Sequence, residues 1–155
     1  MSKDQGAFVL RPGGGRTIDM GAFSMSVKAS SDDTAGVFTL LEATEPAEFG
    51  PPLHIHRNAA EAFYVLEGEY NIFIEEREHR CPAGSFIYIP AGIVHGFRVG
   101  SAPSRKLNLY APAAMVGYFD ALAANRDRPM APDELTEMAR EHGVEMVGPV
   151  PEGYR

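Results

Sequence analysis

Four of the five histidines in this chain lie within residues 54–95, and three of them, His54, His56 and His95, are candidates for one site together with a glutamate that follows the first two. On a strand, His54 and His56 would point to the same face, about 6.5–7 Å apart at the backbone. Glu61 opens the next apolar stretch, and His95 would have to arrive from a third strand. Imidazoles with one carboxylate suit a divalent first-row transition metal. These four side chains are candidate ligands of one ion, although a histidine pair on an edge strand could also be merely solvated.

The other reactive side chains fit structural roles better. His79 lies in the charged hairpin EEREHRC, and His142 lies near the end of a predicted helix, where a positive charge interacts favourably with the helix dipole. Cys81 precedes Pro82 without a neighbouring activating cation, so we expect a small buried hydrophobe and not a nucleophile. The run RPGGGR lacks the Gly-Lys-Ser/Thr ending of a phosphate-binding loop and indicates a turn. We assign none of them to the site.

Short strands must position the candidate ligands. Residues 23–29 alternate apolar and polar side chains, as a half-buried strand does, and residues 37–43 form a more continuously apolar strand. The apolar run 7–10 indicates an edge segment or arm. Six further stretches rich in β-branched or aromatic residues are separated by Gly, Pro or charged turns: 53–56, 62–70, 71–76, 85–90, 95–100 and 106–111. The pattern predicts an antiparallel all-β sandwich or barrel.

The pattern changes at Pro112, which is well placed to begin a helix. We expect an amphipathic helix over 113–125 and a second helix over 133–143, which ends at a glycine. The tail after it contains two prolines, so it should be extended and lie along the body without forming an element of its own. The predicted organisation is a β-domain with an N-terminal arm over 1–111 and a helical appendage over 112–155, packed on the same domain.

The composition indicates which classes of partner and which cellular compartment we expect for this protein. The chain has 155 residues, with 21 acidic and 14 basic side chains and a net charge of −7. This charge repels phosphate backbones and anionic lipids, so we expect neither nucleic acid nor a membrane as a partner. No apolar run approaches the roughly 18 residues of a membrane span, and the first ten residues lack the apolar region of a signal peptide. Together with a single cysteine, this predicts a cytoplasmic protein.

Two motifs in this chain resemble those of the cupins. The first reads Gly50-PPL-His54-I-His56-RNAA-Glu61-AFYVLE-Gly68, and the second reads Gly84-SFIYI-Pro90-A-Gly92-IV-His95-GFR-Val99. The spacer after Gly50 has three residues where five are usual, and Val99 replaces the usual Asn. Neither position is a ligand position in the family. The resemblance covers roughly residues 8–111, and the helical tail is similar to that of small quercetinase-like cupins.

The resemblance implies a cupin barrel, which is a double-stranded β-helix or jelly roll, followed here by a pair of short α-helices. It also implies that His54, His56, Glu61 and His95 bind one divalent transition metal, which could be iron, nickel, manganese, cobalt, copper or zinc. A homodimer is expected because cupins usually pair their barrels. The run 85–90, apolar on both faces, agrees with that expectation.

The expected function is a quercetinase-like dioxygenase that brings an enolic or aromatic small molecule to react with O2. A cupin isomerase or cyclase and a metal-dependent binding module remain open, because one fold hosts many chemistries. Glu61 is the candidate general base, and Phe63 and Phe97 share the inward faces of Glu61 and His95. These two rings and Met25 are candidate substrate-binding residues, with plain core packing as the alternative.

Overall fold

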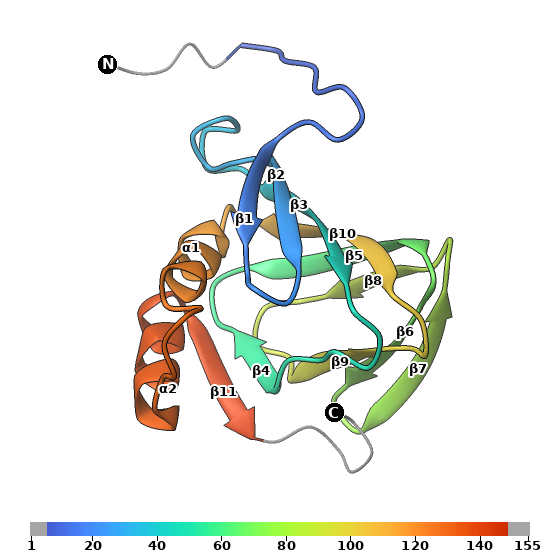
Figure 1. Ribbon diagram of the computed structural model, residues 1–155, viewed down its shortest axis with the longest axis vertical. Coiled ribbons are helices and arrows are strands. Elements are labelled where there is room, and N and C mark those ends of the chain that lie inside the picture. The colour runs from blue at the N-terminus through green and yellow to red at the C-terminus, as the bar shows by residue number, and fades with distance from the viewer. Residues whose placement is uncertain (1–5, 149–155) are drawn as a thin grey trace.

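A computed structural model describes residues 6–148 as two facing antiparallel sheets with two helices at one side (Figure 1). The six-stranded sheet has the order β1-β2-β3-β10-β5-β8, and the five-stranded sheet has the order β11-β4-β9-β6-β7, in which β11 spans Val144–Gly148. The strands of the barrel are β1 Arg16–Asp19, β2 Ser24–Ala29, β3 Thr39–Glu45, β4 Leu53–His56, β5 Ala60–Glu67, β6 Glu69–Ile74, β7 Arg77–Pro82, β8 Phe86–Ile89, β9 His95–Val99 and β10 Ser104–Ala111. The predicted all-β jelly-roll barrel is confirmed.

Alternation along each strand separates the interior from the outer surface. Strand β10 buries every second side chain from Ser104 to Tyr110 and pairs with both β3 and β5. Gly68 closes the turn between β5 and β6 with a φ of 76°, and a Cβ there would lie 2.1 Å from the Ser104 hydroxyl oxygen. Only glycine fits that position, which explains its place in the first motif. Strand β1 was missed in the sequence because it is short and mostly exposed.

The C-terminal segment differs from expectation in two respects. Helix α1 spans Val116–Ala124, later than predicted, because Met115 before it has a left-handed φ of 78°. After helix α2, Pro132–Glu141, the chain forms strand β11, Val144–Gly148, so the expectation that the tail forms no element is wrong for these residues. Strand β11 pairs with β4, and its Val144 is buried in one apolar cluster with residues of both helices. The rest of the tail lies outside the described residues, and the division at residue 112 stays a prediction.

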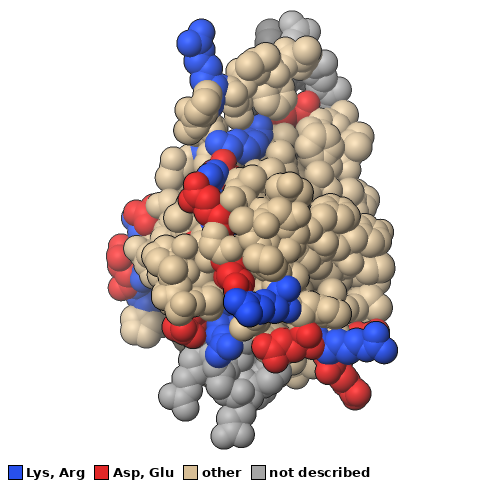
Figure 2. All heavy atoms as spheres, turned by 90° about the vertical axis from the view of Figure 1, so that its right-hand side faces the viewer, with Lys and Arg blue, Asp and Glu red and all other residues tan. Residues whose placement is uncertain are grey.

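The outer surface mixes charges with one apolar area. Basic and acidic side chains alternate along one face, beside a broad uncharged region (Figure 2). On the outer side of strands β5 and β8, Tyr64, Phe86 and Tyr88 are 44%, 67% and 59% exposed. Tyr64 lies opposite Phe86 across the strand pair, so these aromatic side chains are neighbours. Among the described residues, no helix is long and apolar enough to cross a membrane.

Candidate metal centre

Three strands from both sheets bring the four candidate ligands together. His54 and His56 come from β4, His95 comes from the neighbouring strand β9, and Glu61 comes from β5 of the opposite sheet. His54 is the direct cross-strand partner of His95. The amide of Gly92 donates to the His56 carbonyl at 2.9 Å, so the loop of the second motif is tied to the strand of the first. The cluster therefore bridges the two sheets inside the barrel.

The ligand atoms of the cluster converge on one point. One nitrogen or oxygen from each of the four side chains lies within 4.8 Å of every other. Glu61 Oε2 lies 2.8 Å from Nε2 of His56 and 2.8 Å from Nε2 of His95. Three of the four residues are buried, and His54 is half-buried. This is the size and the donor set of a site for one transition-metal ion.

Backbone carbonyls fix the orientation of two imidazoles. Nδ1 of His54 lies 2.7 Å from the Pro52 carbonyl oxygen, and Nδ1 of His95 lies 2.9 Å from the Ile93 carbonyl oxygen. Because a carbonyl only accepts, each Nδ1 must carry the hydrogen. In the neutral ring the Nε2 lone pair then faces the cluster, an arrangement that orients metal-ligating histidines in proteins.

His56 supplies the observation that tests whether a metal fits. Its Nε2 atom is buried and, within residues 6–148, has no aligned hydrogen-bond partner, although Glu61 Oε2 is only 2.8 Å away. A buried nitrogen without a partner is costly, and a coordinated cation would satisfy it. The residues present therefore fit a divalent metal.

Burial and mutual contacts set the charges of the cluster. Burial raises the pKa of Glu61, but His56 and His95 outweigh it and hold that pKa well below its usual range. Burial and the nearby His95 lower the pKa of His54 to about 4. Burial lowers the pKa of His95, but the Glu61 carboxylate more than compensates, so the pKa lies above its usual value. The cluster holds an ionised carboxylate beside a neutral His54.

Tyr110 is a further residue of this cluster that the sequence analysis missed. It is 2% exposed, lies directly opposite Glu61 across strands β10 and β5, and has its ring 5.4 Å from that of His56. Burial and the Glu61 carboxylate raise its pKa well above the usual range. The alternation in KLNLYA places Tyr110 on one face with Lys106 and Asn108, so this pattern could have identified it.

The candidate substrate-binding residues fall into two places. Phe63 and Phe97 point into the barrel, and their ring centroids lie 6.0 Å apart. Phe63 follows Glu61 by two residues on β5, and Phe97 follows His95 by two residues on β9. Both rings are buried. The Lys106 ammonium lies 4.8 Å from the ring centroid of Phe63 and 4.4 Å from that of Phe97. Met25 belongs to the other apolar cluster of the barrel. The structure brings Phe63 and Phe97 together and keeps Met25 apart from them.

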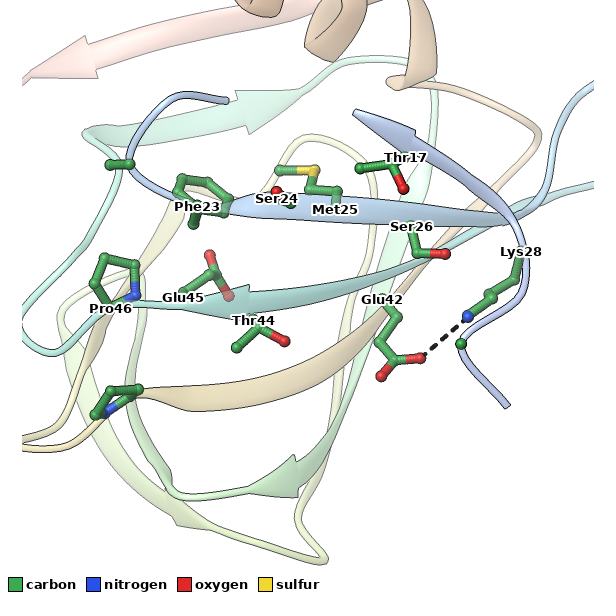
Figure 3. Close-up of a pocket in the computed structure, with 13 residues that line it drawn as sticks. Thr17, Phe23, Ser24, Met25, Ser26, Lys28, Glu42, Thr44, Glu45 and Pro46 are labelled. Atoms are coloured by element: carbon green, nitrogen blue, oxygen red, sulfur yellow. Dashed lines mark ion pairs between the residues drawn. The ribbon is translucent and has the colours of Figure 1, made fainter. Parts of the chain in front are cut away.

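A pocket of about 500 Å³ lies away from the candidate ligands (Figure 3). Side chains of β1, β2 and β3 line it, and Lys28 pairs with Glu42 across it at 3.4 Å. Met25 is among its lining residues, whereas none of the four candidate ligands is.

His79 and Cys81 also lie outside the candidate centre. His79 is exposed. Cys81 is a buried free thiol, and burial and the nearby Glu69 raise its pKa.

Comparison with known proteins identifies a matching domain family and a curated relative. Residues 40–110 match the cupin domain family. The quercetin 2,3-dioxygenase of Bacillus subtilis (strain 168) is 26% identical over 115 residues, which are 74% of this chain and 34% of that protein. The chain thus spans about a third of the length of this curated relative.

Two solved structures share the fold. The polyketide cyclase RemF of Streptomyces resistomycificus is 22% identical, with a TM-score of 0.59 over 68% of this chain and 79% of that chain. The Streptomyces protein PAC13, in a structure with uridine, is 11% identical, with a TM-score of 0.62 over 96% of both chains. At these identities the likeness concerns the fold and not the reaction.

Proposed function

Because this chain belongs to the cupin superfamily, we propose that it is a metal-dependent enzyme of the dioxygenase type, acting on an enolic or aromatic small molecule. The observation that carries the proposal is the convergence of His54, His56, Glu61 and His95 within 4.8 Å. The similarity to quercetin 2,3-dioxygenase supports the choice of reaction class. The proposed cofactor is one divalent transition metal per chain, chosen from iron, nickel, manganese, cobalt, copper and zinc.

In this proposal His54, His56, Glu61 and His95 hold the metal. When bound, the metal supplies Lewis acidity toward an enolate or hydroxyl oxygen and a place for chemistry with O2. The buried surroundings of His56 and His95 exclude water from the reacting groups. The two backbone carbonyls at Pro52 and Ile93 keep the imidazoles oriented throughout.

Glu61 is the proposed general base. It is 3% exposed, and its pKa stays well below the usual range despite burial, because His56 and His95 stabilise the ionised form. An ionised carboxylate beside the substrate hydroxyl can accept its proton and so produce the reactive anion. Phe63 and Phe97 are the proposed aromatic contacts for the substrate. A substrate contact by Met25 stays a prediction from the sequence, because Met25 lines a pocket that none of the four candidate ligands lines.

Proton-transfer chemistry without O2, as in an isomerase or a cyclase, is the second candidate. The observation that favours it is Tyr110, a second proton-bearing side chain that lies opposite Glu61 in the barrel. A carboxylate and a hydroxyl on one site can act as general base and general acid, which is what moving a proton within a substrate requires.

Oxygen uptake tests the proposal. Protein reconstituted separately with each of the six metals is mixed with a panel of enolic aromatic compounds, with His95→Ala as the matched control. We expect uptake with at least one metal in the wild-type protein and none above background in the variant. Product formation without uptake would move the assignment to the isomerase or cyclase class. Substrate binding without turnover under every condition would contradict an enzyme and indicate a binding module.

The proposed assembly is a homodimer in the cytoplasm. Strand β8 ends the order of its sheet, and the exposed Tyr64, Phe86 and Tyr88 give that edge an apolar outer face. A second copy presents the same face, so a twofold contact would cover both areas at once. The buried free thiol of Cys81 is compatible with a reducing compartment.

A further inference from the structure

The pocket beside strands β1, β2 and β3 is lined by polar side chains that the proposed function does not use. Its volume of about 500 Å³ is that of a site for a small molecule. The RPGGGR run brings the N-terminal arm against this pocket, and Gly13 is one of the lining residues. A Cβ on Gly15 would lie 2.4 Å from the Val27 carbonyl oxygen, so only glycine allows the arm to approach β2 so closely.

Four hydroxyl side chains lie in two cross-strand pairs along this pocket. Ser26 of β2 lies opposite Thr17 of β1, and Ser24 of β2 lies opposite Thr44 of β3. All four residues belong to the lining (Figure 3). A hydroxyl both donates and accepts hydrogen bonds, so this group of side chains can bond several polar atoms of one ligand in either direction.

The ion pair at one end of the pocket already compensates its own charges. Lys28 lies 3.4 Å from Glu42, and Glu42 also pairs with Arg105 at 2.6 Å. Lys28 donates a further hydrogen bond to the Gly14 carbonyl oxygen at 2.6 Å. An ionic ligand would have to compete with these partners for either charge. The lining therefore favours a neutral ligand over an anion or a cation.

Glu45 indicates that the ligand carries hydrogen-bond donors. Its side chain is 2% exposed and nevertheless belongs to the lining of the pocket. Oε1 pairs with the Lys106 ammonium and accepts a hydrogen bond from the Tyr70 hydroxyl, both at 2.9 Å. Within residues 6–148, Oε2 of Glu45 accepts no hydrogen bond. A carboxylate oxygen at this depth is costly without a donor, and a hydroxyl of a ligand would supply one.

The end of the pocket away from the Lys28–Glu42 pair is apolar, with the rings of Phe23 and Pro46 (Figure 3). The Phe23 ring packs against that of Phe49, with the ring centroids 4.8 Å apart. Apolar rings beside hydroxyls suit a molecule that has both a carbon–hydrogen face and hydroxyl edges. A wholly apolar ligand would instead cover the hydroxyls of the pocket without giving them hydrogen-bond partners.

We propose that this pocket is a binding site for a neutral polyhydroxylated compound, a sugar or a cyclic polyol. Hydroxyls of the ligand bond Glu45, Ser24 and Thr44, and its carbon–hydrogen face packs on Phe23. None of the four candidate metal ligands lines the pocket, so the inference goes beyond the proposed function and does not depend on it.

An NMR titration of the ¹⁵N-labelled full chain tests the ligand class. The probes are D-glucose, D-galactose and myo-inositol, with choline, inorganic phosphate and cyclohexanol representing cations, anions and apolar rings. We expect at least one polyhydroxylated probe to bind with a Kd of about 1–10 mM and to shift the amide signals of residues 23–26 and 42–45. If none of the three bound at about 100 mM, or if choline, phosphate or cyclohexanol bound more tightly at these residues, the proposal would be overturned.

Two substitutions at exposed positions test the location of the site. Thr44→Val replaces one hydroxyl by a methyl group and should weaken binding of the polyhydroxylated probe by about 2–10-fold, whereas Ser24→Trp fills the pocket and should abolish binding. The matched control is Thr136→Val, at an exposed threonine of helix α2, which should keep the wild-type affinity. Urea unfolding midpoints near that of the wild type would show that each variant is folded. Wild-type affinity in both Thr44→Val and Ser24→Trp would overturn the proposal.

Discussion

At the scale of single residues, the candidate centre places an ionised carboxylate among imidazoles in a buried space. His56 and His95 lower the pKa of Glu61 further than burial raises it, and burial holds the pKa of His54 near 4. The centre therefore offers an anion and a neutral imidazole without protonation competing at either group near neutral pH. Because metal ligands must be deprotonated, these two groups are ready to bind a cation.

Glu61→Gln separates the ligand role from the base role. If Glu61 only binds the metal, activity should fall in proportion to the metal lost, because an amide oxygen is a weaker, uncharged ligand. If it is also the base, metal-replete Glu61→Gln should bind substrate and lose about 10²–10⁴-fold in turnover. Turnover and metal content are measured on the same preparation. Near-normal turnover in the metal-replete variant would remove the base role.

At the scale of elements, each ligand depends on how its strand is held. Strand β4 carries two histidines and lies between β9 and β11, so the C-terminal segment completes the support of the site. Val144 lies opposite His56, and Met146 lies opposite His54. The pattern of short apolar stretches predicted a sandwich or barrel, and the resemblance of the two motifs implied which ligand candidates meet. Neither predicted β11, because its structure depends on pairing with β4 and not on local propensity.

Val144→Ala tests the support of β4 by β11. Val144 is 2% exposed, so its truncation should lower the free energy of unfolding by about 1–2 kcal/mol through lost burial and a small cavity. Metal affinity should also fall, because His56 lies opposite Val144 across the strand pair and would lose a packing contact. Val147→Ala in the same strand is the control, because Val147 is 49% exposed and should change stability by less than about 0.5 kcal/mol. Equal effects of both variants would contradict this role for β11.

Glu42 joins three strands and predicts an acid-dependent loss of stability. It pairs with Arg105 of β10 at 2.6 Å and with Lys28 of β2 at 3.4 Å. Burial raises its pKa, but these two cations together lower it below 4.5. Its contribution is therefore present above the unfolded pKa and disappears as the pH falls through the folded pKa.

Urea unfolding of Glu42→Gln measures this effect. The variant should be less stable than the wild type by about 0.5–1 kcal/mol at pH 7, the range of partly exposed ion pairs, and the difference should be smaller at pH 3. Glu76→Gln, at an exposed turn position, should match the wild type at both pH values. A difference that persisted unchanged at pH 3 would exclude the ion pairs as its cause.

At the scale of the whole molecule, the sequence predicted the class of fold and the set of candidate ligands, while other features needed three dimensions. Phe63 and Phe97 were expected on the inner face and lie there, but the ammonium of Lys106 between their strands was not anticipated. A lysine in an alternating strand ordinarily indicates the solvated face. Here the Glu45 carboxylate, more than 60 residues earlier in the chain, pairs with the Lys106 ammonium and compensates its charge. A pairing between residues so far apart in the chain cannot be recognised from the local sequence pattern.

The exposed aromatic face predicts the oligomeric state. Light scattering at micromolar concentration should give the mass of a dimer, and the double variant Phe86→Glu, Tyr88→Glu should give a monomer that still binds metal. Charges directed at an identical partner face repel each other and lose the apolar burial. Val37→Glu, at another exposed apolar position, should stay dimeric. A monomeric wild type would contradict this assembly.

The most direct test of the account is elemental analysis of the purified protein and its single variants. We predict one divalent transition metal per chain in the wild type, with sharply reduced metal in His54→Ala, His56→Ala, Glu61→Ala and His95→Ala. His79→Ala, which changes an exposed histidine outside the cluster, should retain full occupancy. Full occupancy in His95→Ala, or a wild type that takes up no metal when all six are offered, would contradict the four-ligand centre.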